Sequence, residues 1–291
     1  MSKTPSAFER GPHASVRYSQ LDPEARLGLS PGHGTSPSAS STLLLAGLLL
    51  VIIYLPAFLF RNTTAGETVW TALTGYQRIP IAIAATSCWA AAILIIKSLK
   101  IRGQRRILRA TLVPDAPEFR IDGQTVSDVL ARLPEQLDDP SRFLLADRID
   151  RVLRNVRNVG RVADIDEMFA SAAESDESRM ESSYTILRGL VWAIPVLGFI
   201  GTILGLTMAI GEFQGVLDAS GADEATLVRE LGEVIGGLET AFVTTGEGLV
   251  AALVLQLGVV LCRRGDESLL DDIRDYCTVR ILSLVRISRV D

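Results

Sequence analysis

The chain has 291 residues, of which 48% are hydrophobic and 22% are charged, and its mean hydropathy is +0.29. An apolar excess beside an ordinary share of charge indicates long apolar stretches between polar ones. The formal net charge of −5 gives no argument for nucleic-acid binding. Three cysteines at irregular spacings and two histidines argue against a zinc or disulfide framework, so we expect neither a metal site nor a cofactor.

Residues 1–40 are rich in Ser, Pro, Gly and His and predict a disordered tail. Residues 42–60 then run without a charge, and a span of the bilayer core needs about 20 apolar residues. A cleaved signal peptide would need a short basic start and a small-residue cleavage motif. Because the preceding tail is long and no such motif follows Phe60, we predict a first transmembrane helix at 42–60.

Residues 79–96 form a second uncharged run, which completes a predicted membrane region at 41–96. The short connection between the two runs carries Trp70 and Tyr76, which suit a membrane interface. A basic cluster follows the second run and predicts that this end, and therefore the N-terminus, is cytoplasmic. The cluster consists of Lys97, Lys100, Arg102, Arg105, Arg106 and Arg109.

Residues 97–187 are polar with apolar side chains at helical spacing over 143–156 and 165–187, which predicts a cytoplasmic helical region. Two further apolar runs, at 190–213 and 240–262, predict the third and fourth transmembrane helices within a channel region at 188–265. Basic residues flank this pair at the ends predicted to be inside, and the connection between them is acidic, so both pairs predict the same topology.

The last segment, 266–291, predicts a cytoplasmic amphipathic helix. Its apolar residues follow one another at steps of three or four and would share one face. They are Leu270, Ile273, Cys277, Ile281 and Leu284.

The third predicted helix carries small residues on one face, and small residues let membrane helices approach closely. These candidate packing residues are Gly198, Gly201, Gly205 and Ala209. For the glycines alone, generic helix packing is a more common explanation of this spacing than a special role. Pro195 removes one backbone hydrogen bond and is expected to bend or start the helix.

The fourth predicted helix contains Glu247 at a depth where an acidic side chain is costly, which indicates a function. The alternative is that Glu247 reaches the outer interface and is merely tolerated. Thr202, Thr244 and Thr245 are further polar groups at depth. A single membrane threonine most often bonds a carbonyl of its own helix, so their significance comes from the surrounding pattern.

Two sequence runs carry a family resemblance. PVLGFIGTILG at 195–205 resembles the PLLGLLGTVxG signature of TolQ and ExbB, and AFVTTGEGLVAA at 241–252 resembles their EALxxTAxGLxxAIP signature. Their order and spacing also agree, so the region 188–265 resembles the MotA/TolQ/ExbB proton channel family. The four-span layout, with a large segment between spans two and three, is more similar to MotA than to TolQ or ExbB.

This resemblance implies an all-α, four-helix inner-membrane protein that assembles as a homo-oligomeric, pentameric ring around a dimer of a single-span ExbD/TolR/MotB-like partner. It implies that Thr202 and Thr245 face the pore. The sequence departs from the family where Thr240 replaces a glutamate and where Glu247 replaces an apolar residue. Thr245 and Glu247 lie about 160° apart on a helix, so both cannot face one pore, and we expect Glu247 to be protonated and hydrogen-bonded to a hydroxyl.

The function expected from these observations is a bacterial proton channel subunit of a rotary motor, with both termini in the cytoplasm. A secondary transporter would show inverted repeats, and none is evident between the two helix pairs. A non-conducting scaffold or sensor stays open, since only the threonine-bearing signatures argue against it. We expect no enzymatic activity, because no nucleophile–base set, phosphate loop or metal-ligand cluster stands out.

Overall fold

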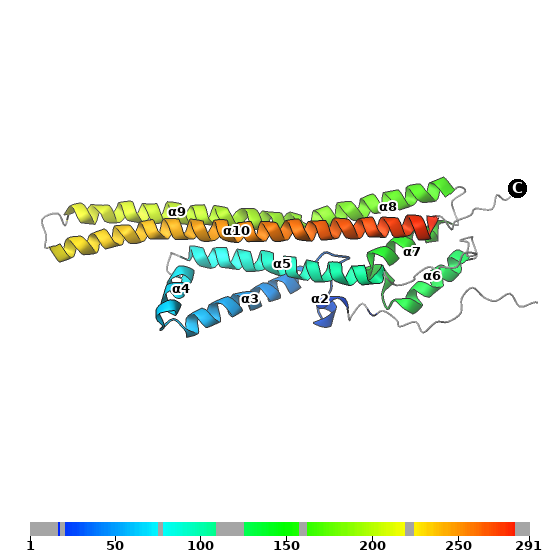
Figure 1. The fold of residues 1–291 in the computed structure, drawn as a ribbon, viewed down its shortest axis with the longest axis horizontal. Helices are drawn as coiled ribbons and strands as arrows, with labels where there is room; N and C mark the ends of the chain where they lie inside the picture. Colours follow the sequence, from blue (N-terminus) through cyan, green and yellow to red (C-terminus); the bar gives the residue numbers. More distant parts are fainter. Residues whose placement is uncertain are drawn as a thin grey trace, which may run out of the picture. The chain divides into compact units, whose positions relative to one another are not determined.

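The computed structural model describes residues 17, 21–74, 78–108, 125–156, 162–218 and 224–282. All of the secondary-structure elements assigned in these residues are helices (Figure 1). The chain divides into two units. Unit 1 comprises residues 1–38, 95–184 and 262–291, and unit 2 comprises residues 39–94 and 185–261. The long helices α5 and α10 contribute residues to both units.

Unit 2 contains the apolar helices. They are α3 (Ala39–Leu59), α5 (Ile79–Ile107), α9 (Thr185–Asp218) and α10 (Glu224–Arg280). Each is long and apolar enough to cross a membrane, which confirms the prediction of four spanning helices. The helices extend beyond the predicted spans, because polar residues at their ends continue the helical backbone once the apolar run has nucleated it.

The apolar faces of unit 2 are mostly uncovered. The most apolar window of α3 is 17% buried, and those of α9 and α10 are 28% and 22% buried, whereas that of α5 is 44% buried. Trp192, Ile210 and Phe242 each expose more than two thirds of their surface. Contiguous apolar surfaces of this size are not stable against water, so lipid or other protein chains cover them.

The connection predicted at 61–78 contains a helix that the sequence did not indicate, α4 (Thr64–Thr74). Trp70 packs edge-to-face on Phe58 of α3, with ring centroids 5.7 Å apart. The Tyr54 hydroxyl of α3 donates a hydrogen bond to the Leu73 carbonyl, at 3.3 Å. Aromatic contacts with α3 therefore hold α4, and Tyr76 lies outside the described residues.

Unit 1 is built from α6 (Thr125–Gln136), η1 (Pro140–Arg142), α7 (Leu144–Val156), α8 (Val162–Ser183) and parts of α5 and α10. The apolar face of α7 is fully buried and packs against α6 and α8. It consists of Leu145, Ile149, Val152 and Leu153. The helical content predicted for 97–187 is therefore present, with α6 as an additional helix.

The helix predicted at 266–291 is instead the continuation of α10, which ends at Arg280. Its buried stripe consists of Leu269, Ile273, Cys277 and Ile281. Leu270 of the predicted stripe is only half-buried, one position beside Leu269, and Leu284 lies outside the described residues.

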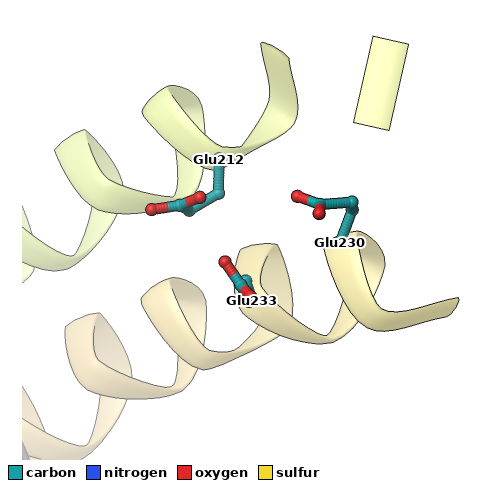
Figure 2. A group of neighbouring side chains, drawn as sticks. All are labelled: Glu212, Glu230 and Glu233. Atoms are coloured by element: carbon teal, nitrogen blue, oxygen red, sulfur yellow. The ribbon is translucent and has the colours of Figure 1, made fainter. Parts of the chain in front are cut away.

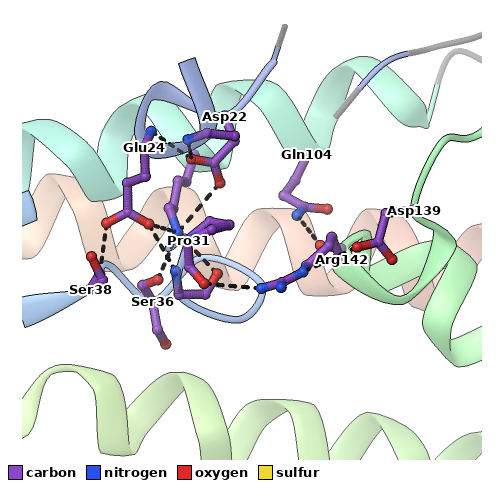
Figure 3. A network of polar contacts seen from close by, with 11 residues as sticks. Asp22, Glu24, Pro31, Ser36, Ser38, Gln104, Asp139 and Arg142 are labelled. Atoms are coloured by element: carbon purple, nitrogen blue, oxygen red, sulfur yellow. Dashed lines mark hydrogen bonds and ion pairs between the residues drawn. The ribbon is translucent and has the colours of Figure 1, made fainter. Parts of the chain in front are cut away.

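The prediction of a disordered tail at 1–40 differs from the structure over residues 21–38, which form an ordered segment with the short helix α2 (Pro23–Arg26) (Figure 3). The Glu24 carboxylate accepts hydrogen bonds from the backbone N–H of Gly32, at 2.9 Å, and of Ser38, at 2.7 Å. Glu24 also pairs with the buried Lys100 ammonium of α5, which donates to the Ser36 carbonyl at 2.9 Å. Lys100 thus orders this segment from more than sixty residues away.

Candidate ion pathway in the α9–α10 pair

Glycines set the distance between α9 and α10 in unit 2. A Cβ added at Gly205 would lie 2.6 Å from the Ala241 nitrogen, and one added at Gly237 would lie 2.7 Å from the Ala209 nitrogen. One added at Gly198 would lie 2.9 Å from the Thr244 carbonyl oxygen. These neighbours are backbone atoms that cannot rotate away, so a larger side chain would force the helices apart.

The predicted packing face of α9 is thus occupied by α10 of the same chain. Gly201 faces the side chain of Thr244, and Ala209 is buried beside Gly237. Because the face is already filled within the chain, contacts between subunits would have to use the exposed apolar faces.

Thr202 and Thr245 meet across this contact. Their hydroxyl groups are hydrogen-bonded to each other. The Thr202 hydroxyl also lies 3.2 Å from the Ala241 carbonyl oxygen, and that of Thr245 lies 3.2 Å from the Gly198 carbonyl oxygen. Both side chains are half-buried. Two residues that are 43 positions apart in the sequence therefore form one hydroxyl pair bridging the two helices.

Thr244 does not join this pair. It is fully buried, and its hydroxyl donates to the Thr240 carbonyl of its own helix, at 2.8 Å. Thr240, at the position where the family has a glutamate, likewise donates to the Gly236 carbonyl, at 2.9 Å. These back-bonded hydroxyls satisfy themselves within α10, so Thr244 serves the packing against Gly201.

The hydroxyl pair borders an uncovered surface. On α9, Thr202 is adjacent to the exposed side chains of Phe199, Ile203 and Leu206. On α10, Thr245 lies about 40° from the exposed Leu249 and about 60° from the exposed Phe242. The opposite side of α10 faces α5, since a Cβ added at Gly258 would lie 2.9 Å from the Leu94 side chain. The pair is therefore placed at the edge of the face that α5 leaves free.

Glu247 lies elsewhere on α10. It is within about 20° of Gly258 around the helix axis and about 160° from Thr245. Its half-buried side chain interacts electrostatically with Tyr54 of α3. The structure therefore separates Glu247 from the two threonines, as the helical geometry predicted. Pro195 lies within α9, which continues as one helix on both sides of it.

Three carboxylates lie close together near the C-terminal end of α9 and the N-terminal end of α10 (Figure 2). The oxygens of Glu212, Glu230 and Glu233 lie within 4.8 Å of one another. Arg229 forms ion pairs with Glu230 and Glu233, so the chain itself supplies part of the positive charge that this cluster requires. We assign no metal to it.

Unit 1 contains a buried ionic network around Lys97, a residue that the sequence indicated only as part of a basic cluster that sets the topology. The Lys97 ammonium lies 2.8 Å from the Asp266 carboxylate, and both side chains are almost fully buried. Lys97 also donates to the Ser183 hydroxyl at 2.8 Å and lies 4.3 Å from the centre of the Tyr184 ring. The Tyr184 hydroxyl donates to Asp266 at 2.9 Å. Burial and the Asp266 charge raise the pKa of Tyr184.

A second buried pair joins α7 to α8 in unit 1. Two nitrogens of Arg148 donate to one oxygen of Asp176, at 2.9 and 2.8 Å, and Arg151 donates to the other at 3.0 Å. Burial raises the pKa of the Cys277 thiol to about 12, against the opposing effect of the Arg148 charge. Alternating Arg and Asp on α7 was visible in the sequence, but the partner on α8 was not.

Comparison with known proteins places these features in a family. Residues 138–274 match the model of the MotA/TolQ/ExbB proton channel family, which extends the region of the two signatures to include α7 and α8. No curated protein and no solved structure matches the chain. Four apolar helices of spanning length indicate a multi-pass membrane protein. The chain therefore carries a MotA/TolQ/ExbB proton channel family domain, which implies a proton channel subunit of a membrane motor-like complex.

Proposed function

We propose that this chain is the channel subunit of a bacterial inner-membrane motor that couples proton flow to mechanical work through a single-span ExbD/TolR/MotB-like partner. The observation that supports the proposal most directly is the Thr202–Thr245 pair at the edge of an uncovered apolar face. Hydroxyls in an apolar wall hold water or the ion where the wall alone would exclude both. The chain conducts protons and has no catalytic role.

The proposed assembly is a pentameric ring that encloses a dimer of the partner. The exposed stripes of α9 and α10 supply its apolar surface, because the glycine face is already used within the chain. The partner's acidic residue would sit beside the threonine pair. Native mass spectrometry of the tagged chain, purified in mild detergent with its co-purifying proteins, should show five copies with two partner chains. Monomers alone would contradict this assembly.

The proposed topology has both termini in the cytoplasm and the connection between α9 and α10 in the periplasm. The charge asymmetry of the sequence supports it. In intact cells, a membrane-impermeant maleimide should label a cysteine placed at Asp223 and should miss one placed at Asp147. The reverse pattern would invert the topology. The native cysteines, Cys88, Cys262 and Cys277, are all buried, so background labelling should be small.

The threonine pair provides the central experiment. Thr202→Val and Thr245→Val keep the side-chain volume and remove the hydroxyl, so the complex should assemble while proton flux falls by about tenfold or more. Flux is measured with a pH-sensitive dye in proteoliposomes containing the purified complex, under an imposed membrane potential. Thr207→Val is the matched control, since the exposed Thr207 bonds only the Ile203 carbonyl of its own helix. Wild-type flux in both pair variants would refute the assigned pathway.

A further inference from the structure

The side of α10 that faces away from the threonine pair carries the one acidic residue of the fourth predicted span, Glu247. Glu247 shares this side with Gly258, which contacts Leu94 of α5, and it interacts electrostatically with Tyr54 of α3. Among the described residues, Glu247 makes no hydrogen bond and no ion pair, so the hydrogen bond to a hydroxyl that the sequence predicted is not formed. A half-buried carboxyl group therefore lies on the side of α10 that contacts α5, with no partner among the described residues that would fix its charge.

Its neighbours are polar but carry no positive charge. The Tyr54 hydroxyl donates to the Leu73 carbonyl, so its oxygen keeps lone pairs that can accept a proton from a neutral carboxyl. Tyr54 of α3 interacts electrostatically with Glu247 and with the buried Cys88 of α5. No Lys or Arg occurs in the four predicted spans at 42–60, 79–96, 190–213 and 240–262.

A second polar group without a partner lies on α5. The oxygen of Ser87 is buried and has no hydrogen-bond partner among the described residues. Ser87 precedes Leu94 by seven residues and so lies within about 20° of it, on the side of α5 that faces α10. Buried polar atoms are rarely left unpaired, and a bound water is the usual partner when the protein supplies none.

We propose that Glu247, with Tyr54 and Ser87, forms a second proton-binding site in each subunit, between α3, α5 and α10 and separate from the threonine pair. A carboxylate without a cation at this depth is costly, so the resting site holds the neutral acid. Loss of the proton to water leaves a carboxylate and a hydrated proton, which balances charge without another reactant. In the motor, loss and gain of this proton would change the packing of α10 against α3 and α5. This role rests on the proposed function, whereas the existence of the site does not.

The site is tested by infrared difference spectroscopy of the purified protein in lipid, with ¹³C-labelled glutamate, during a stepwise change of pH. The wild type should show a protonated-carboxyl band that disappears reversibly as the pH rises. Glu247→Gln should remove the band, and Glu247→Asp and Tyr54→Phe should shift its titration. Glu267→Gln, which changes an exposed glutamate further along the same helix, is the matched control and should leave the band unchanged.

Three results would overturn the proposal: no band that depends on Glu247, a band that does not titrate while the protein stays folded, or a titration that Tyr54→Phe leaves unmoved. The measurement needs no proton flux, so it is independent of the test of the channel. If the threonine variants conduct normally while the band titrates, the pathway fails and the proton site stands. If flux depends on the threonines but no band titrates, the proton site fails and the channel stands.

Discussion

The two units of this chain bury polar groups differently. In unit 1, every buried charge among the described residues has a partner of opposite charge. In unit 2, the buried polar side chains of the described residues are hydroxyls, at Ser41, Thr42, Thr240 and Thr244. An ion pair repays part of its desolvation cost only when its geometry is fixed by surrounding protein. A helix in lipid instead satisfies small polar groups within its own backbone.

The largest expected effect comes from breaking a buried pair in unit 1. Asp266→Ala leaves the Lys97 ammonium buried without its counter-charge, so the free energy of unfolding should fall by about 3–5 kcal/mol. The double variant Lys97→Met with Asp266→Leu removes both charges and should stay near the wild type. Denaturant unfolding followed by circular dichroism measures both. If the double variant is as unstable as the single one, the network contributes more than charge pairing.

The next effect concerns Cys277, whose raised pKa of about 12 leaves very little thiolate at neutral pH. With Cys88 and Cys262 replaced by alanine, Cys277 should react with a maleimide on the order of 10³-fold more slowly than a cysteine placed at the exposed Thr278. The same raised pKa makes stability depend on pH, because the thiol of the unfolded chain ionises at a lower pH than the buried thiol does. Unit 1 should lose stability as the pH rises from the unfolded value of about 9 towards 12. Equal labelling rates would show that Cys277 is accessible.

In unit 2, the packing of α9 against α10 is tested by adding a single methyl group at a glycine. Gly205→Ala places a Cβ against backbone atoms of Gly237 and Ala241 and should cost about 1–3 kcal/mol. Gly211→Ala has open space around it, so the better helix propensity of alanine should stabilise the protein by up to about 1 kcal/mol. Thermal unfolding in mild detergent compares the two. A stabilising Gly205→Ala would mean that α9 and α10 can separate without loss.

The smallest effect is expected at an exposed pair of unit 1. Arg263 lies 2.9 Å from Glu267 and 3.4 Å from Glu181, and all three side chains are more than two fifths exposed. Solvent screens such pairs, so Arg263→Ala should change the free energy of unfolding by no more than about 0.5 kcal/mol. The same denaturant series provides the measurement. A loss comparable to that of Asp266→Ala would remove the distinction between buried and exposed pairs.

The spanning helices and the angular separation of Thr245 and Glu247 were predictable from sequence, because both follow from local periodicity. The ordered segment at 21–38 was not, because Ser, Pro and Gly predict disorder and its order depends on Lys100. The partner of the glycine face was not predictable either. Spacing shows that a close contact exists but does not tell whether a second helix of the same chain or a neighbouring subunit supplies it.

The glycine contact has a mechanical consequence. Backbones that touch at Gly198, Gly205 and Gly237 have little freedom to slide or twist against each other, so α9 and α10 should move together as one rigid body. The hydroxyl pair of Thr202 and Thr245 belongs to this rigid body and would keep its geometry during the proposed motor cycle. In the proposed motor, movement would then occur outside the α9–α10 contact, either at the uncovered apolar face or where α10 packs against α3 and α5.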